Sequence, residues 1–350
     1  MTVPVALHAL STALAPHELP QDLVGRRAEE VLGPRYPQLQ RLLSTFASAG
    51  IDRRRSVVPL DWFDAREIGW KERNDAYLAG GAALFLDAAA RALAEAEWRA
   101  TDVDVIVTVS STGVATPTLE ALVADEMGFR ADALRVPVFG LGCAGGATGL
   151  SIAAQLARGA PGARVLLVVV EACTVSFRTD RLRKSDIIAT VLFGDGAAAA
   201  CLATGEAAMT CAPGVQHRWA DTLGIMGWDV DDAGLGVVFD RSIPDFAARH
   251  MAEARDAGFA AMGRTPESVD RMICHPGGAK VIQALESSLD LGQGALDLER
   301  EVLRAHGNMS APTVLFVLDA ARKTGLRGRM MATALGPGFS AAFTPVEMAA

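Results

Sequence analysis

The sequence predicts an α/β fold built from two similar halves. Half of the 350 residues are hydrophobic (50%), so the chain can bury a large core. Two largely apolar runs, VDVIVTV at residues 103–109 and RVLLVVV at residues 164–170, are typical of strands covered on both faces. Each half follows the same order of helix, strand, polar loop, glycine turn, helix and strand. This order predicts two pseudo-duplicated βαβ layers, residues 1–210 and 211–350, with a site at their junction.

In the first half, helices and strands alternate after a loop-rich start. Residues 19–43 are expected to be helical, and apolar residues recurring every three or four positions predict an amphipathic helix over residues 76–98. The strand at residues 103–109 leads into a polar loop. The remaining expected elements are a helix at 118–127, a strand at 135–139, a helix after the glycine turn at 140–149 and a strand at 164–170.

The second half repeats this order with diverged residues. An amphipathic helix is expected at 246–262, and a strand at 269–274 runs directly into His275. A second glycine turn carries Asn308, which falls in the same slot of the repeat as Cys143. The other expected elements are helices at 281–285 and 312–323 and a last strand at 330–335.

Composition excludes several classes of function. The net charge is −8 and no long basic run occurs, which argues against a nucleic-acid surface. Near the amino terminus no basic segment precedes an apolar one, and the longest apolar runs are too short to span a bilayer. We therefore expect neither a signal peptide nor an integral membrane segment. The five cysteines are odd in number and form no CxxC pair, so we expect reduced thiols, no metal site and a cytoplasmic enzyme.

The most informative stretch is VPVFGLGCAGGATGL, a glycine-rich turn between a strand and a helix. Gly140, Gly142 and Gly145 match the GxGxxG fingerprint, and Glu171 ends the following strand, so a dinucleotide-binding oxidoreductase is one alternative. That fingerprint normally opens its βαβ unit, however, and a cysteine is unusual in a turn that must admit pyrophosphate. We favour Cys143 as a nucleophile whose thiolate is stabilised by the positive end of the helix dipole. A buried core thiol is the other alternative.

A nucleophilic thiolate needs a partner, and two of the six histidines lie in marked settings. His275 directly follows a strand and precedes Pro-Gly-Gly, which holds its ring at the strand end. His306 precedes the glycine turn that carries Asn308. The Asn308 amide can donate to a developing oxyanion, with a turn or helix-cap role as its alternative. The histidines without such a context are His8, His17, His217 and His250.

These residues carry a resemblance to a known family. Cys143, His275 and Asn308 lie in this order within GLGCAGG, HPGGAKVI and HGNMSAPTVLF. With LFGDGAAA at residues 192–199 and LGPGFS at residues 335–340, the motifs resemble the type III polyketide synthases, the chalcone and stilbene synthase family. The resemblance is strongest to bacterial members that make alkylresorcinols and alkylpyrones. The β-ketoacyl carrier-protein synthases III share a Cys-His-Asn trio but differ in the histidine motif and lack the closing GPG loop, so they are the runner-up.

The resemblance implies a thiolase-like αβαβα layered fold, a homodimer, and decarboxylative condensation of malonyl-CoA onto an acyl-CoA starter. Cys143 would carry the starter and the growing chain as a thioester. His275 and Asn308 would stabilise the enolate formed from malonyl-CoA and the oxyanion of each condensation, and His275 would also pair with the Cys143 thiolate. Neither a cofactor nor a metal is expected, because the CoA thioesters are substrates.

The resemblance also assigns positions around the substrates. Phe193 matches the family's gatekeeper phenylalanine, whereas Val237 stands at the second gatekeeper position and suggests a wider passage without an aromatic gate. The other substrate-binding positions are Ser111, Thr112, Cys173, Ser176, Trp228, Ser310, Pro337 and Gly338. The cluster of Arg53, Arg54 and Arg55 is a candidate grip for CoA phosphates, with a solvated face as its alternative.

The pocket positions suggest a starter and a product. Ala115, Thr116 and Cys173 are small and leave room for an acyl tunnel; Thr116 stands where plant members carry a methionine that reaches across the dimer. We therefore expect a medium- or long-chain acyl-CoA starter and a few malonyl-CoA additions, with ordinary packing as the alternative. Trp228 matches a small residue of the plant members, and our hypothesis is that its ring directs cyclisation to a resorcinol rather than a pyrone.

Overall fold

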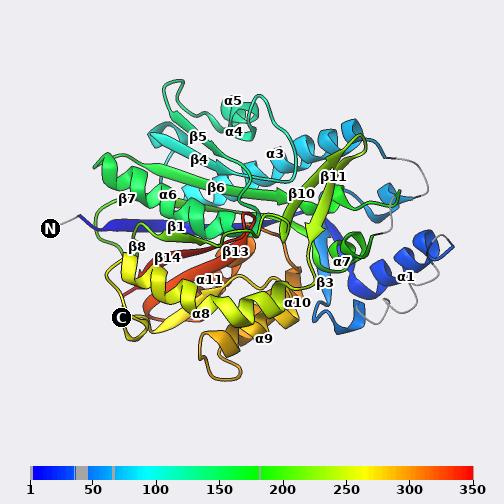
Figure 1. Cartoon of the computed structure of the whole chain (residues 1–350). Coiled ribbons are helices and arrows are strands. Elements are labelled where there is room, and N and C mark those ends of the chain that lie inside the picture. Colours follow the sequence, from blue (N-terminus) through cyan, green and yellow to red (C-terminus); the bar gives the residue numbers. More distant parts are fainter. Residues whose placement is uncertain (1–2, 35, 37–45, 65–67, 181–182, 350) are drawn as a thin grey trace.

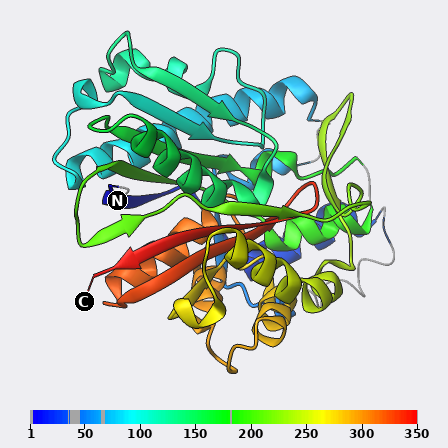
Figure 2. The same cartoon turned by 60° about the vertical axis from the view of Figure 1, so that its left-hand side comes forward.

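The computed structural model describes residues 3–34, 36, 46–64, 68–180 and 183–349. The main sheet is continuous, and its two halves lie on either side of a middle layer of helices, with further helices on both outer faces. Figure 1 and Figure 2 show the cyan and green first half on one side of the yellow-to-red second half, with the blue strand β1 between them. This is the thiolase-like αβαβα layering that the sequence motifs imply.

The first half contributes five adjacent strands to the sheet. In spatial order these are β1 (Val5–Leu14), β7 (Asp195–Thr204), β6 (Val165–Ala172), β4 (Val105–Val109) and β5 (Leu134–Val138). Strand β4 is parallel to both β5 and β6, whereas β7 is antiparallel to β6 and to β1. The carboxyl ends of β4, β5 and β6 therefore share one edge, where ligand-binding loops of α/β sheets normally lie.

The second half extends the same sheet. Its strands are β8 (Met209–Cys211), β14 (Ser340–Met348), β13 (Gly328–Gly336) and β12 (Arg271–Cys274), and β9 (Val215–Arg218) pairs with β14. Strand β8 pairs with both β1 and β14, so the expected division at 210/211 falls inside a strand that joins the two halves. Two strand pairs stand apart: β2 (His17–Pro20) with β3 (Arg53–Ser56), and β10 (Met226–Asp231) with β11 (Gly234–Phe239).

Helices fill the middle of the molecule and cover both outer faces. The middle layer is α6 (Gly145–Gly159) and α11 (Thr313–Lys323), which contact strands of both halves. Helix α3 (Trp70–Glu95) covers the outer face of the first half, and α8 (Ile243–Ala261), α9 (Ala279–Ser288) and α10 (Asp297–His306) lie on the second. The other described helices are α1 (Gln21–Leu32), α4 (Leu119–Leu122), α5 (Ala124–Met127) and α7 (Lys184–Leu192). Short 3-10 turns occur at Leu60–Phe63, Ala100–Asp102, Gly142–Ala144, Cys173–Ser176 and Pro266–Ser268.

The alternation of side chains along β6 explains why its sequence is apolar throughout. Val165, Leu167 and Val169 pack into the middle layer, whereas Leu166 and Val168 face α3. Because successive residues of a strand point to opposite faces, a strand between two helical layers needs apolar residues at every position.

Most expected elements are present with shifted ends, and two differ. The expected helix at 118–127 is broken at Val123 into α4 and α5. The expected helix at 19–43 begins later, because β2 runs to Pro20, and α1 ends at Leu32. Residue 35 and residues 37–43 of that prediction lie outside the described residues. Cys143 and Asn308 each lie in the turn that leads into a middle-layer helix, two residues before α6 and five residues before α11.

Among the described helices, α3 alone is long and apolar enough to cross a membrane by length and composition. Its apolar residues, including Leu84, Phe85 and Ala88, are buried against β1, β6 and β7. The helix therefore has the contacts of a core helix.

Candidate active site

Cys143 lies where the glycine-rich turn meets the middle layer. Gly140 and Gly142 have φ angles of +88° and +46°, in the region that favours glycine. Helix α6 starts at Gly145, so the cysteine sits at the amino-terminal end of a buried helix. A Cβ on Gly142 would lie 2.8 Å from the Cδ of Pro337, which means that the turn packs directly on the closing GPG loop.

His275 is the first residue after β12. Its backbone N–H donates to the carbonyl oxygen of Thr333 (2.8 Å), which extends the pairing of β12 with β13 to the histidine and fixes where the ring leaves the strand. The residue is 4% exposed, and within the described structure neither ring nitrogen has a hydrogen-bond partner. Cys143, His275 and Asn308 line one small cavity of about 20 Å³, so the structure brings the predicted trio together.

Asn308 is held by its own turn and by the segment that carries Phe193. Its Nδ2 donates to the carbonyl oxygen of Gly277 (3.3 Å), and its Oδ1 accepts from the backbone N–H of Ser310 (2.8 Å). The Asn308 backbone N–H donates to the Leu192 carbonyl oxygen (2.9 Å), and its carbonyl oxygen accepts from the Gly194 N–H (3.0 Å). The catalytic asparagine candidate and the gatekeeper candidate are therefore fixed to each other through the backbone.

Burial sets the protonation states of the trio. It raises the pKa of the Cys143 thiol to about 11, although hydrogen bonds with Ser310 and Asn308 act in the opposite direction. It also lowers the pKa of His275 to about 3. In the free protein, burial therefore opposes the thiolate that the helix end favours, because a buried thiolate loses its hydration. At neutral pH the pair is a thiol and a neutral imidazole, which can accept the thiol proton as the sulfur attacks.

A larger apolar cavity of about 200 Å³ opens over Cys143. Eight of the predicted substrate-binding residues line it: Ser111, Thr112, Cys173, Phe193, Trp228, Val237, Ser310 and Pro337. Two do not. Ser176 lines a separate small pocket behind Thr112, and Gly338 follows Pro337 without facing the cavity.

The cavity has an aromatic pair that the sequence analysis missed. The rings of Phe193 and Phe239 meet edge to face with centroids 6.1 Å apart, and both line the cavity. The expectation of a passage without a second aromatic residue is wrong, because Phe239 supplies the ring that Val237 lacks. Residues two apart on a strand share a face, so Val237 and Phe239 of β11 both point into the cavity.

Glu171 is a second residue whose role the sequence analysis missed. It is fully buried at the end of β6, and its Oε2 accepts from the Ser111 backbone N–H and the Thr112 hydroxyl, both at 2.9 Å. The other carboxyl oxygen has no partner in the described structure, and burial raises the pKa of Glu171 to about 8. This carboxyl anchors the loop that carries Ser111 and Thr112, and its burial leaves nothing for a ribose to contact.

The arginine cluster does not act as one phosphate grip. Arg54 is fully buried and its Nη1 donates to the carbonyl oxygen of Phe193 (2.6 Å), so the prediction that it contacts CoA phosphates is wrong. Side chains alternate along β3, which turns Arg54 inward between Arg53 and Arg55. Arg55 pairs with Glu18 (2.9 Å), and Arg53 is exposed.

A metal site has no support within the described residues, where no group of three or more His, Cys, Asp or Glu side chains is placed to hold an ion.

The fold and the site together define a condensing acyltransferase of the thiolase-like kind, with a buried cysteine facing an apolar cavity.

Comparisons with known proteins narrow this class to a family. Residues 65–206 match the model for the N-terminal domain of chalcone and stilbene synthases, and residues 212–346 match the model for the C-terminal domain. The chain therefore belongs to the chalcone and stilbene synthase family, the type III polyketide synthases.

Individual relatives and a solved structure agree with this family assignment. A 1,3,6,8-tetrahydroxynaphthalene synthase of Streptomyces peucetius subsp. caesius is 39% identical over 348 residues, covering 96% of this chain and 91% of that protein. Type III polyketide synthase A of Arabidopsis thaliana is 30% identical over 260 residues, covering 68% and 64%. The crystal structure of 1,3,6,8-tetrahydroxynaphthalene synthase from Streptomyces coelicolor A3(2) superposes with a TM-score of 0.91 at 26% identity, covering 98% of this chain and 99% of that one.

Proposed function

We propose that this polyketide synthase builds its product on Cys143 from an acyl-CoA starter and malonyl-CoA. The Cys143 sulfur attacks the starter carbonyl, the bond from that carbonyl to the CoA sulfur breaks, and CoA leaves. Malonyl-CoA then loses CO₂, and the resulting enolate carbon attacks the Cys143 thioester, which releases the cysteine sulfur and forms a β-ketoacyl-CoA. Transfer of that chain back to Cys143 allows another round. Neither a metal nor a redox cofactor takes part in these steps.

The observation that carries this proposal is the shared cavity of Cys143, His275 and Asn308. The two open nitrogens of His275 and the fixed amide of Asn308 are suited to an enolate or oxyanion beside the sulfur. A neutral imidazole donates one hydrogen bond without requiring a buried positive charge.

For the starter, we propose a medium- or long-chain fatty acyl-CoA, with cyclisation to an alkylresorcinol or an alkylpyrone. The lining of the cavity above Cys143 is mostly apolar and includes small residues such as Cys173 and Ser310, which favours an acyl chain. A second candidate product is 1,3,6,8-tetrahydroxynaphthalene, because the synthase that is 39% identical carries that name. This product has no alkyl side chain, so it would retain no fatty starter.

A product profile by mass spectrometry separates these candidates. Incubation with malonyl-CoA and acyl-CoA starters of increasing length should give alkylated aromatic or pyrone products whose mass follows the starter. Malonyl-CoA alone yielding the naphthalene as the sole product, with every acyl-CoA ignored, would favour the second candidate. Activity only with malonyl attached to a carrier protein would instead favour a β-ketoacyl synthase III.

Trp228 is expected to direct cyclisation. Its Nε1 donates to the Ser111 carbonyl oxygen (2.7 Å), which holds the indole ring in the wall of the cavity. Trp228→Gly should widen the cyclisation space and shift the product ratio from resorcinols towards pyrones, measured by chromatography with one starter. Trp228→Phe keeps most of the ring and should stay nearer the parent ratio. An unchanged ratio in Trp228→Gly would rule out this role.

We also propose a homodimer formed through the edge of β5. This strand pairs only with β4 among the described strands, and it leaves Leu134 (55% exposed) and the following Phe139 (61% exposed) uncovered. An open sheet edge beside exposed apolar residues is a surface that natural proteins normally cover.

All five cysteines are free thiols, which fits a cytoplasmic location.

A charged side chain introduced at the edge of β5 tests the proposed dimer. Leu134→Glu should shift the protein to the monomer mass in analytical ultracentrifugation, because pairing would bury an unpaired carboxylate. Leu223→Glu is the matched control, since Leu223 is 76% exposed and lies away from β5. A wild-type protein that sediments as a monomer would remove the basis of the proposal.

A further inference from the structure

The hairpin of β10 and β11 forms one wall of the cavity but is not part of the main sheet. It supplies Met226, Gly227, Trp228, Val237, Val238 and Phe239 to the lining. The two strands pair only with each other in the described structure. Isolated two-stranded hairpins are at best marginally stable in water, so the position of this wall depends on side-chain contacts with the body.

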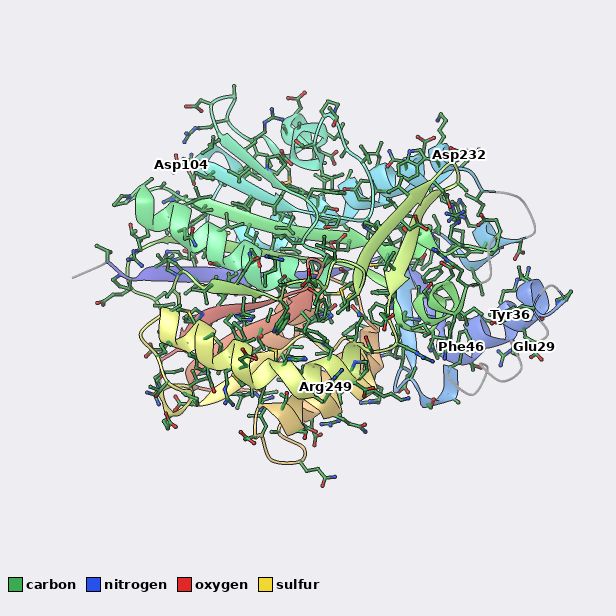
Figure 3. The ribbon with its side chains drawn as sticks, viewed as in Figure 1. Glu29, Tyr36, Phe46, Asp104, Asp232 and Arg249 are labelled. Carbon is green, nitrogen blue, oxygen red and sulfur yellow. The ribbon has the colours of Figure 1, made fainter. Side chains whose placement is uncertain are left out.

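Contacts hold the hairpin at its base and at its tip. At the base, the Asp240 N–H donates to the Ile225 carbonyl oxygen (2.9 Å). At the tip, a Cβ on Gly234 would lie 3.2 Å from the Trp70 ring and 3.1 Å from the Arg73 side chain, so the turn packs tightly on the start of α3. Figure 3 shows Asp232 at the outer end of this hairpin, far from its base.

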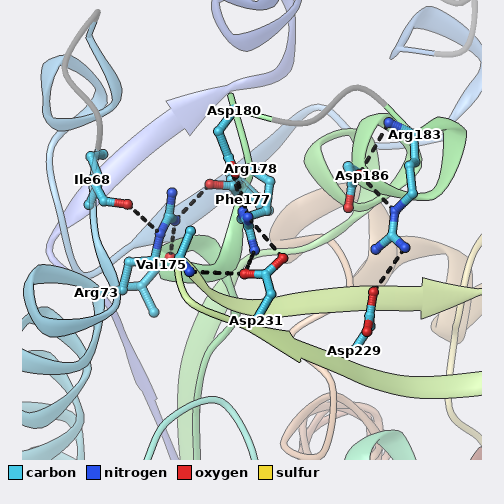
Figure 4. A network of polar contacts seen from close by, with 11 residues as sticks. Ile68, Arg73, Val175, Phe177, Arg178, Asp180, Arg183, Asp186, Asp229 and Asp231 are labelled. Carbon is cyan, nitrogen blue, oxygen red and sulfur yellow. Dashed lines mark hydrogen bonds and ion pairs between the residues drawn. The ribbon is translucent and has the colours of Figure 1, made fainter.

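The strongest tip contact is an ion pair between the buried Arg178 and Asp231, whose side chain is 40% exposed. The Arg178 side chain is 2% exposed, and its guanidinium meets the Asp231 carboxylate with two bonds, Nη1 to Oδ1 at 2.9 Å and Nη2 to Oδ2 at 3.2 Å. Asp180 engages the same guanidinium through Nε at 2.6 Å (Figure 4). Two-point pairing of this kind fixes direction as well as distance.

Arg178 is itself anchored to the body. It follows Phe177, and the carbonyl oxygens of Phe177 and Val175 both accept from Nη1 of the buried Arg73, at 2.7 and 2.5 Å (Figure 4). The same short segment carries Cys173, which also lines the cavity. The ion pair thus ties the hairpin to the segment that supplies this second part of the lining.

We propose that Arg178 and Asp231 are positioning residues that hold the hairpin closed on the cavity and thereby limit the length of polyketide built at Cys143. This inference rests on the iterative condensation proposed above. Trp228 and Val237 lie on the hairpin between its base and its tip, so a hairpin released at the tip moves both away from the sulfur. The enlarged cavity then accommodates a chain with a further malonyl unit before cyclisation.

The chain offers a matched control on the same hairpin. Arg183 pairs with Asp229 at 3.0 Å, but those side chains are 45% and 49% exposed. A pair in which both partners are exposed contributes little because water and salt screen it, whereas Arg178 is 2% exposed and its two-point bond to Asp231 is shielded on the arginine side. Loss of Arg183 should therefore move the hairpin much less than loss of Arg178.

The experiment compares Arg178→Met, Asp231→Asn and Arg183→Met with the wild type. Product chain lengths are measured by mass spectrometry with one acyl-CoA starter. The rate at which iodoacetamide alkylates Cys143 is measured on the same proteins without substrate, because an opened hairpin exposes the sulfur. Both the ratio of longer to principal product and the alkylation rate should rise about fivefold in Arg178→Met and Asp231→Asn, and change less than about twofold in Arg183→Met.

The outcomes test the positioning role of Arg178 and Asp231 separately from the proposed polyketide synthesis. Folded Arg178→Met and Asp231→Asn proteins with wild-type chain lengths and alkylation rates would overturn the proposal, and so would equal changes in Arg183→Met. If Arg178→Met does not fold, Asp231→Asn carries the test, because it leaves Arg178 paired with Asp180. A wild type that makes no polyketide from any CoA thioester would overturn the proposed function. The alkylation rates would still test whether Arg178 and Asp231 hold the hairpin closed.

Discussion

Cys143→Ala should lose polyketide formation by at least about 1,000-fold, the scale on which removing the nucleophile acts in a covalent enzyme. Without the sulfur, neither the starter nor the growing chain can be held as a thioester. Asn308 loses its hydrogen bond with the sulfur, but His275 and Asn308 keep their places, since hydrogen bonds to Thr333, Gly277 and the backbone around Phe193 hold them without the cysteine. The variant should therefore still decarboxylate malonyl-CoA and release acetyl-CoA.

The measurement follows both activities in the same assay, acetyl-CoA by chromatography and polyketide by mass spectrometry. Asn308→Ala is the reciprocal variant, and loss of one oxyanion donor should slow decarboxylation by about 100- to 1,000-fold. Cys211→Ala controls for the loss of a buried thiol, because Cys211 lies on β8, packs in the core beside the middle layer and lines neither cavity. Polyketide made by Cys143→Ala at a wild-type rate would refute the nucleophile assignment.

The trio could be predicted from the sequence because each member has a strong local pattern. Cys143 and Asn308 follow glycine turns that open helices, and His275 ends a strand. Residues whose role depends on distant packing could not be predicted. A charged run is normally solvated, and only the pairing of β2 with β3 shows that Arg54 turns inward to the Phe193 carbonyl.

The aromatic pair of Phe193 and Phe239 also depends on packing that the local sequence does not reveal. Val237 and Phe239 belong to one strand face, but the choice between them requires the position of the Phe193 ring, which comes from the end of α7.

The sequence pattern marks Glu171 only as the acid of a dinucleotide fingerprint. Its contacts with Ser111 and Thr112 join residues 60 and 59 positions apart, which local patterns cannot reveal.

The fold was predicted where periodicity was strong and missed where packing overrides propensity. Strand β7 has the sequence DGAAAACLAT, and alanine favours helices over strands. Its alternate residues face α3 and the middle layer, as Ala199 and Ala200 illustrate. Small side chains let helices approach both faces of this strand, so the tertiary structure decides its conformation.

Gly146→Ala should destabilise the protein although alanine is the better helix former. Propensity alone predicts a gain of about 1 kcal/mol inside α6. A Cβ at this position, however, would lie 2.2 Å from the carbonyl oxygen of Ala311 and 2.8 Å from a methyl of Val314. The first of these atoms is backbone just before α11, so the start of this helix must move away, and overpacking of this kind typically costs about 1–3 kcal/mol. Because Asn308 lies in the turn that leads into α11, the shift should also separate its amide from Cys143 and lower the condensation rate. Gly159→Ala is the control on the same helix, since its Cβ would meet nothing within 4 Å.

Thermal unfolding should show a lower Tm for Gly146→Ala and an equal or slightly higher Tm for Gly159→Ala. Equal stability of the two variants would mean that the two middle helices do not depend on this glycine for their close approach.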